Sequence, residues 1–373
     1  VTADRSDGTM TVRDKRTGRV LPGLNRFVDG GDRGDSYAYW APERDGTVDT
    51  PAKPPAVDVA EDGPARFTLE IRSVYRLPRS LNGRRKARSA KTVECAIRSR
   101  VSLYPGVRRV DFWTEVDNQA LDHRLRVHFP TDVQAEVTHA EQHFGVVARP
   151  AAAPAADETW MEDPVATYPQ KSFVDVSDSR QGVLLANRGL PEYGTLAGVN
   201  GLTLALTLLR SVGWLCRADM TTRKGLAGPP FIETPDAQCL GRHVFEYSLI
   251  PHEGEWLQAF AEAHRFANLL RARSFAATGG SLPPQGAFLE VTSSRLVLSG
   301  LKFAENGSGV VARLYNIGDR AVRARVRLVE AYQKAELVDL NERLIAELSP
   351  QGGWVEVKAR RNEIVSLFFR MSM

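Results

Sequence analysis

The chain has 373 residues, of which 43% are hydrophobic and 25% are charged, which is ordinary for a globular protein of one large or two smaller domains. Its 49 basic and 45 acidic residues give a net charge of +4, too small to indicate a nucleic acid partner. The longest apolar run, residues 202–209, is shorter than the about 20 residues of a membrane-spanning helix, so we expect no membrane partner.

The N-terminal residues have the pattern of a β-hairpin. Turn residues stand at Asp7–Gly8 and again at Thr17–Gly18, with strand-forming residues between them. Val1 occupies the place of an initiator methionine, and no signal peptide pattern precedes the hairpin. We therefore expect the chain to be a segment of a longer polypeptide.

Residues 25–42, NRFVDGGDRGDSYAYWAP, combine three aspartates with three glycines and a run of aromatic residues. Carboxylates are costly to gather unless a cation or hydroxyl groups meet them, so Asp32 and Asp35 are candidates for binding sugar hydroxyls or a cation. Aspartates also cap turns by accepting backbone N–H bonds. The residues alone favour neither a binding loop nor a structural loop.

Two tyrosines of this stretch, Tyr37 and Tyr39, lie two positions apart and share one face of an extended strand. Aromatic rings bind sugars by stacking on their C–H faces. Core packing explains at least one of the two tyrosines equally well.

Alternation of apolar and polar residues with a period of two predicts a series of strands after this loop. The predicted strands are residues 66–76, 93–104, 108–118, 125–129, 173–177, 182–187 and 202–210. A basic run at 79–91 contains Asn82–Gly83, which is typical of a hairpin tip, and it lacks interleaved aromatic residues. We interpret this run as a solvated turn.

One stretch, residues 255–273, has the spacing of an amphipathic helix, because large and small apolar residues recur every three or four positions. Residues 278–286 are rich in glycine and proline and form the predicted linker. The fold class is therefore all-β, with one amphipathic helix before the linker. The predicted domains are a large β-sandwich at 1–277 and a small C-terminal β-sandwich at 287–373.

No constellation for catalysis or metal binding stands out. His139 and His143 have a helical spacing, but HAEQH lacks the glutamate of the HExxH zinc motif and lies in a strand-like region. The chain also lacks a GxSxG nucleophile motif and the glycine patterns of phosphate-binding loops. We expect no catalytic residue and no metal ligand in this chain.

Several segments, taken together and in order, resemble the C-terminal half of bacterial glycoside hydrolase family 38, the α-mannosidases. The segments are GDRGDSYAYWAP, GLPEYG, LTLLRSVGWL, ETPDAQCLGRHVFEYSLIPHEG, LVLSGLKFAENGSGVVARLYN and LNERL. The resemblance implies that the larger domain is a galactose-mutarotase-like super-β-sandwich. It also implies that zinc and the aspartate nucleophile of a retaining α-mannosidase belong to an N-terminal barrel that this sequence does not contain.

The resemblance further implies three substrate-binding residues. Tyr37 matches a tyrosine that faces the catalytic cleft, Asp35 lies beside it as an acceptor for a sugar hydroxyl, and Arg149 is a third, less secure match. The implied partners are an α-mannoside substrate and the N-terminal catalytic domain, in the cytoplasm. The linkage, the aglycone and association into a homo-oligomer stay open.

Two alternatives to this non-catalytic portion of an α-mannosidase remain. A free-standing carbohydrate-binding module would use the same aromatic and acidic loop. An independent mutarotase-like enzyme would use a histidine and a carboxylate as acid and base, with His139, His143 and His243 as candidates.

Overall fold

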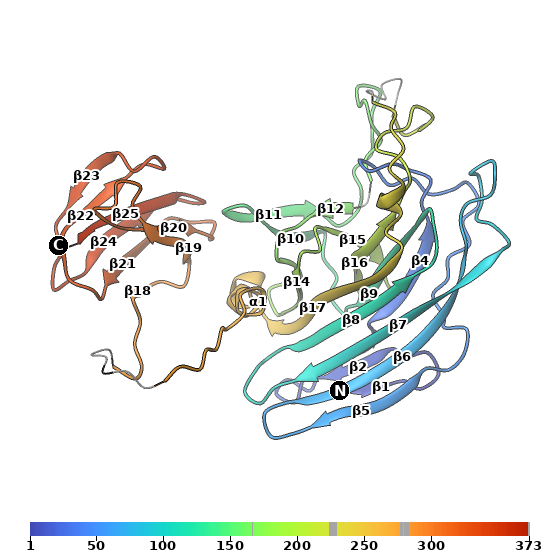
Figure 1. Ribbon diagram of the computed structural model, residues 1–373, viewed down its shortest axis with the longest axis horizontal. Coiled ribbons are helices and arrows are strands. Elements are labelled where there is room, and N and C mark those ends of the chain that lie inside the picture. The colour runs from blue at the N-terminus through green and yellow to red at the C-terminus, as the bar shows by residue number, and fades with distance from the viewer. Residues whose placement is uncertain (166, 224–229, 277–278, 280–282, 372–373) are drawn as a thin grey trace. The chain divides into compact units, whose positions relative to one another are not determined.

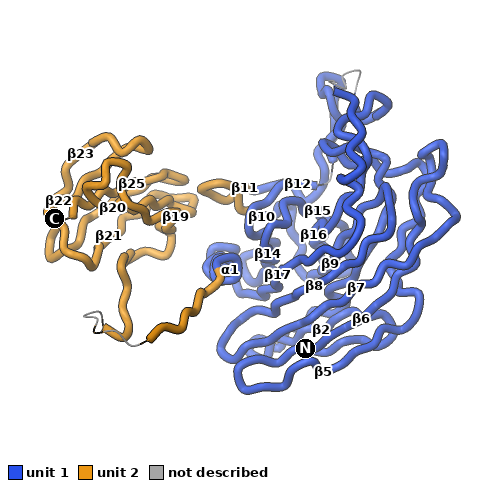
Figure 2. Tube along the Cα trace, viewed as in Figure 1, with its two compact units in different colours: residues 1–140, 148–268 blue, residues 141–147, 269–373 orange. Residues whose placement is uncertain are grey.

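The computed structural model describes residues 1–165, 167–223, 230–276, 279 and 283–371. These residues form two compact units (Figure 2). The first unit contains residues 1–140 and 148–268, and the second contains residues 141–147 and 269–373.

The strands of the first part of the chain lie in three sheets (Figure 1). A nine-stranded sheet has the order β11-β10-β13-β14-β17-β8-β7-β6-β5, a five-stranded sheet has the order β12-β15-β16-β9-β4, and β1-β2-β3 form the third. The bounds are β1 (Thr2–Ala3), β2 (Met10–Arg13), β3 (Val20–Leu24), β4 (Arg26–Gly31), β5 (Ala56–Asp62), β6 (Phe67–Pro78), β7 (Thr92–Leu103), β8 (Val110–Asn118), β9 (His123–Pro130), β10 (Val137–Gln142), β11 (Gly145–Pro150), β12 (Thr167–Pro169), β13 (Phe173–Ser177), β14 (Gln181–Arg188), β15 (Glu192–Ala197), β16 (Leu202–Ser211) and β17 (Gly241–Glu253).

The main core of this unit is formed by apolar side chains from both large sheets. On β8 every second residue is buried, as the alternation in the sequence predicts. Phe112 stacks on Tyr247 of β17 with ring centroids 5.2 Å apart, and Phe129 of β9 meets both rings edge-on. This aromatic cluster joins strands of the nine-stranded sheet to the five-stranded sheet.

Hairpins and turns form where the sequence predicts them. β6 and β7 pair antiparallel from Phe67–Leu103 to Pro78–Thr92, and the basic run joins them. Gly106, in the turn between β7 and β8, has a φ of 74°, which glycine adopts without strain. The all-β prediction is confirmed.

The helix is shorter than the predicted 255–273. A single 3-10 turn, η2 (Trp256–Gln258), precedes α1 (Phe260–Ala267), which buries Phe260 and Phe266 and packs against β14 and β17. The helix ends at Asn268, which has an extended conformation. Leu270 lies within the predicted helix but beyond the observed one, and it is fully exposed.

The second unit is a small β-sandwich of a three-stranded sheet, β18-β21-β24, and a five-stranded sheet, β19-β20-β25-β22-β23. Their inner faces share one hydrophobic core that includes Leu314, Val326, Leu367 and Phe369. The bounds are β18 (Leu289–Val291), β19 (Leu296–Phe303), β20 (Gly309–Asn316), β21 (Val322–Leu328), β22 (Tyr332–Val338), β23 (Leu344–Leu348), β24 (Val355–Ala359) and β25 (Ile364–Met371). Among the described residues of the whole chain, no helix has the length and apolar character needed to cross a membrane.

Truncating Phe129 to alanine should destabilise the first unit by about 3–5 kcal/mol, because the side chain is fully buried between two aromatic rings. The free energy of unfolding in urea measures this effect. Tyr37→Ala is the control, since this aromatic side chain is 69% exposed and its removal should change stability by less than about 0.5 kcal/mol. Equal losses for both variants would contradict the assignment of the core.

Candidate functional site

The segment that follows β4, here called the Asp32–Trp40 loop, folds back on itself. The backbone N–H of Arg33 donates to the carbonyl of Trp40 at 2.8 Å, and that of Asp35 donates to the carbonyl of Ala38 at 3.1 Å. These two bonds form a narrow hairpin whose tip presents Tyr37. The backbone geometry alone therefore leaves few conformations for the tip.

Asp32 is fully buried at the base of this loop. One carboxylate oxygen accepts bonds from the backbone N–H groups of Gly34 (2.9 Å) and Trp40 (3.3 Å), and the other accepts from Arg210 Nε at 2.8 Å. Burial raises the pKa of Asp32, and the charge of Arg210 opposes that rise. Arg210 Nη2 also donates to the carbonyl of Asp35 at 2.9 Å, so one arginine of β16 contacts both the base of the loop and the residue before its tip.

Asp35 is also fully buried, and its carboxylate accepts five hydrogen bonds. Oδ1 accepts from the N–H groups of Tyr37 (3.0 Å) and Ala38 (3.0 Å) and from Arg223 Nη2 (3.1 Å). Oδ2 accepts from Arg223 Nη1 (2.6 Å) and the N–H of Arg217 (2.9 Å). Burial alone would raise the pKa of Asp35, but the bonds from Arg223, Ala38 and Arg217 outweigh it and hold that pKa below its ordinary value.

These contacts give Asp35 a structural role, and its predicted role as an acceptor for a sugar hydroxyl stays a prediction. A carboxylate has about four lone-pair directions, and five donors already surround it. A sugar hydroxyl would have to displace one of these donors to bind Asp35. The geometry supports Asp35 as a positioning residue that holds the tip of the loop, while Tyr37 remains 69% exposed.

The expected strand face is wrong, because Tyr37 and Tyr39 lie after the end of β4 in bends and irregular backbone, and the two rings have different environments. The guanidinium of Arg223 lies 5.9 Å from the centroid of the Tyr37 ring, and most of the surface of Tyr37 is exposed. Tyr39 is half-buried, and the guanidinium of Arg124 lies against its ring at 3.4 Å. Of the two, Tyr37 is the ring that can contact a ligand, and Tyr39 is the one that packs.

The structure places Arg149 apart from these residues. Arg149 is on β11, where its guanidinium lies 5.6 Å from the ring of Tyr168 and its Nε is buried without a hydrogen bond. In the part of the chain that the structure describes, no hydrogen bond, ion pair or ring contact joins Arg149 to Tyr37 or Asp35. Tyr37 and Asp35 thus form one local site, and the substrate-binding role of Arg149 stays a prediction.

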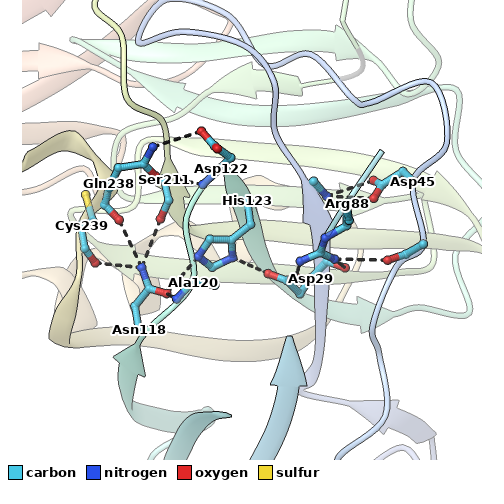
Figure 3. Close-up of polar contacts among 12 residues, drawn as sticks. Asp29, Asp45, Arg88, Asn118, Ala120, Asp122, His123, Ser211, Gln238 and Cys239 are labelled. Atoms are coloured by element: carbon cyan, nitrogen blue, oxygen red, sulfur yellow. Dashed lines mark hydrogen bonds and ion pairs between the residues drawn. The ribbon is translucent and has the colours of Figure 1, made fainter. Parts of the chain in front are cut away.

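A second network of polar contacts joins residues of β4, β8, β9 and β16 (Figure 3). His123, at the start of β9, faces Asp29 of β4 with Nδ1 (2.5 Å) and Asn118, at the end of β8, with Nε2 (2.9 Å). Arg88 pairs with the same Asp29, and Asn118 donates to Ser211 Oγ at the end of β16 (3.2 Å). His123 and Asp29 are inaccessible to solvent. The network therefore joins strands of both large sheets, and its central pair, His123 and Asp29, is closed to a substrate.

The three histidines considered for a mutarotase-like activity lie in unrelated surroundings. His139 of β10 packs near the ring of Trp256, and burial lowers its pKa. His143 is exposed in the turn after β10, and His243 of β17 faces the carbonyl of Cys239 at 2.8 Å. Across the described ranges, no group of three or more His, Cys, Asp or Glu side chains is arranged to hold a metal ion.

Two residues that build the site were not predicted from the sequence. Arg210 ends the apolar run of β16, and an arginine in such a context indicates a buried partner, so this signal was present. Arg223 lies in a polar segment without any periodic pattern, and nothing near it in the sequence points to Asp35. Its role follows only from the tertiary fold.

Comparison with known proteins supports the resemblance found in the sequence. Residues 1–237 match the family described as Glycosyl hydrolases family 38 C-terminal domain, and residues 295–367 match Glycosyl hydrolases family 38 C-terminal beta sandwich domain. A predicted mannosylglycerate hydrolase from Halalkalibacterium halodurans is 26% identical over 97% of this chain and 40% of its own length. Alpha-mannosidase 2C1 from Homo sapiens is 28% identical over 65% of this chain and 21% of its own length.

The solved structures show the same relationship. The crystal structure of an alpha-mannosidase from Enterococcus faecalis V583 superposes with a TM-score of 0.84 at 26% identity, covering 98% of this chain and 40% of that one. The chain therefore spans less than half the length of the relatives that it matches.

Gly34→Ala should distort the Asp32–Trp40 loop, because an added Cβ would lie 2.1 Å from the carbonyl oxygen of Ala38. We expect a loss of about 1–3 kcal/mol in the free energy of unfolding and faster amide exchange at the tip. Gly46→Ala is the matched control, since nothing lies within 4 Å of its added Cβ. An unchanged loop in Gly34→Ala would refute the close approach.

Asp35→Asn should cost about 3–5 kcal/mol at pH 7, because it removes the buried charge that pairs with Arg223 and leaves that arginine only the more exposed Glu162, 3.0 Å from its Nε. The pKa of Asp35 is lowered by folding, so its stabilisation is complete above the ordinary value of 3.8 and disappears as the pH falls through the folded value. The stability difference between wild type and Asp35→Asn should therefore narrow below about pH 4.

Urea unfolding between pH 3 and pH 7 measures this difference. Asp58→Asn is the control, because the ion pair of Asp58 with Arg72 is exposed and should contribute about 0–1 kcal/mol. Equal costs for the two variants, or a difference that widens in acid, would contradict the assigned ion pair.

Proposed function

The chain belongs to glycosyl hydrolase family 38, and from this premise we propose that it is the C-terminal, non-catalytic β portion of a zinc-dependent retaining α-mannosidase. In this role it lines the carbohydrate-binding cleft from the β side. The observation that carries the proposal is the exposed ring of Tyr37 on a loop that two buried ion pairs hold in place. The names of the relatives support an α-mannoside as the substrate.

The chemistry of the loop suits recognition of a sugar. An aromatic ring offers a flat apolar face for sugar C–H groups, and its hydroxyl can both donate and accept a hydrogen bond. Ordering a flexible side chain and loop on binding costs free energy, and a preorganised loop avoids most of that cost. Asp35 acts through Tyr37, because its carboxylate accepts the Tyr37 backbone N–H and fixes the tip.

The bond-breaking chemistry is assigned to a catalytic domain outside this chain. Asp32 and Asp35, which we considered as cation ligands, are paired with Arg210 and Arg223, so these carboxylates do not fit a zinc site. We therefore place the zinc ion and the nucleophile in the partner domain and derive no catalytic step from this chain. The cytoplasmic location is part of the proposal, and three free cysteines support it.

A free-standing carbohydrate-binding module is the second candidate, and the exposure of Tyr37 on a preorganised loop favours it. Calorimetric titration of the isolated chain with mannose and mannobiose separates the two proposals. Sub-millimolar binding supports the module, since such a module needs no partner. Absence of binding supports the first proposal, in which this chain forms only one side of a cleft that another domain completes.

The chain alone, supplied with zinc, should leave p-nitrophenyl α-mannoside intact, whereas a polypeptide that joins it to the family's catalytic domain should cleave it. In that polypeptide Tyr37→Ala should lower kcat/KM on the order of tenfold, the equivalent of one lost hydrogen bond or ring contact. Tyr37→Phe separates the contribution of the hydroxyl from that of the ring.

Phe231→Ala is the control for these assays, because Phe231 is an aromatic residue outside the loop with 47% of its surface exposed. Hydrolysis by the chain alone would show that the non-catalytic assignment is wrong. Unchanged kinetics in Tyr37→Ala would show that this loop does not line the substrate-binding cleft.

A further inference from the structure

The outer face of β9 carries three cationic or titratable side chains in a row. Arg124, Arg126 and His128 occupy alternate positions of the strand and therefore point to the same side, while the intervening apolar residues fill the core. We call these three residues the β9 cationic strip. Because they point away from the hydrophobic core, core packing does not account for these three side chains.

The strip has too few partners for its charge. Glu192 of β15 is the one carboxylate that the described residues bring within ion-pair distance, 3.6 Å from Arg124 Nη1, and it already accepts from Thr207 Oγ1 at 2.6 Å. Arg124 is 7% exposed and His128 is 9% exposed, yet Arg124 Nη1 and His128 Nε2 make no hydrogen bond. Arg126 has neither a hydrogen bond nor an ion pair within the described part of the chain.

The lowered pKa values of Arg126 and His128 agree with this excess of positive charge. Burial, assisted by the charge of Arg124, lowers the pKa of Arg126 to about 10. Burial, followed by the charges of Arg126 and Arg124, lowers the pKa of His128 to about 3, so the ring is neutral at physiological pH. Unpaired cations are costly in a half-buried place, and a bound anion would remove that cost.

The strip is also preorganised and borders the candidate sugar site. The ring of Tyr39 lies against the Arg124 guanidinium at 3.4 Å, which holds this planar group in one orientation. Arg126 is only half-buried, so its guanidinium can meet a ligand. Tyr39 belongs to the same loop that presents Tyr37, so one loop contributes to both surfaces.

We propose that Arg124, Arg126 and His128 form a binding site for a small oxyanion, the carboxylate or phosphate group of a sugar derivative. Guanidinium groups bind such oxyanions through paired, charge-assisted hydrogen bonds, and the free Nε2 of neutral His128 supplies a further polar contact. That the anion is carried by a sugar rests on the proposed function. The anion site itself rests only on the strip.

Calorimetric titration of the whole chain with D-glycerate, with inorganic phosphate and with glycerol, at constant ionic strength, tests the site. We expect saturable binding of at least one anion and none of glycerol. Arg126→Gln should weaken that binding on the order of tenfold or more, because it removes charge-assisted bonds. Arg76→Gln, which removes the same charge from an exposed position of β6, should bind like the wild type.

Thermal unfolding provides the second readout and shows whether the variant folds. In anion-free buffer Arg126→Gln should be at least as stable as wild type, since it relieves repulsion, and the anion should raise the Tm of wild type alone. Absence of binding for both anions, or equal affinity in Arg126→Gln and wild type, overturns the site. Binding of glycerate alone assigns a carboxylate ligand, and binding of phosphate alone assigns a phosphorylated one.

These outcomes are independent of the α-mannosidase proposal. Anion binding together with full activity of Tyr37→Ala would support the anion site and contradict the assignment of the Tyr37 loop to the cleft. A loss of activity in Tyr37→Ala without any anion binding would support the cleft assignment and contradict the anion site.

Discussion

The candidate site depends on the burial of two carboxylates within one short loop. An unpaired buried charge costs several kcal/mol, so Asp32 and Asp35 can lie inside the protein only if cations meet them. The cations are Arg210, 178 residues after Asp32, and Arg223, 188 residues after Asp35. The position of Tyr37 therefore depends on the correct folding of distant segments, which supply both arginines.

The same requirement explains the network around His123. Its polar groups lie at the ends of strands from both large sheets, where a half-satisfied network would be worse than an apolar core. Asp29 satisfies both His123 and Arg88, and Asn118 continues the chain of bonds toward β16. These buried polar contacts favour the one register of the strands in which every member has a partner.

The acidic and basic groups of the first unit are not matched everywhere. The buried aspartates of the loop are saturated with donors, whereas the described residues bring a single carboxylate, Glu192, within ion-pair distance of the β9 cationic strip. A saturated group stabilises the fold, and an unsaturated group is available to a ligand. By this criterion two surfaces can bind a ligand, the Tyr37 ring and the β9 cationic strip. The two are linked through the Asp32–Trp40 loop, because that loop presents Tyr37 and also carries Tyr39, whose ring contacts Arg124 of the strip.

The sequence by itself determined the all-β class, the strands of β6 to β9, the tight turns and the loop around Tyr37, because these features follow from local periodicity and turn chemistry. It overestimated the helix, since the pattern continues past Asn268 where no surface remains for packing. Only the tertiary structure decided that Asp35 is a buried anchor and that Arg210 and Arg223 hold it. Ion pairs across nearly 190 residues leave no local pattern, because they depend on which strands the fold brings together.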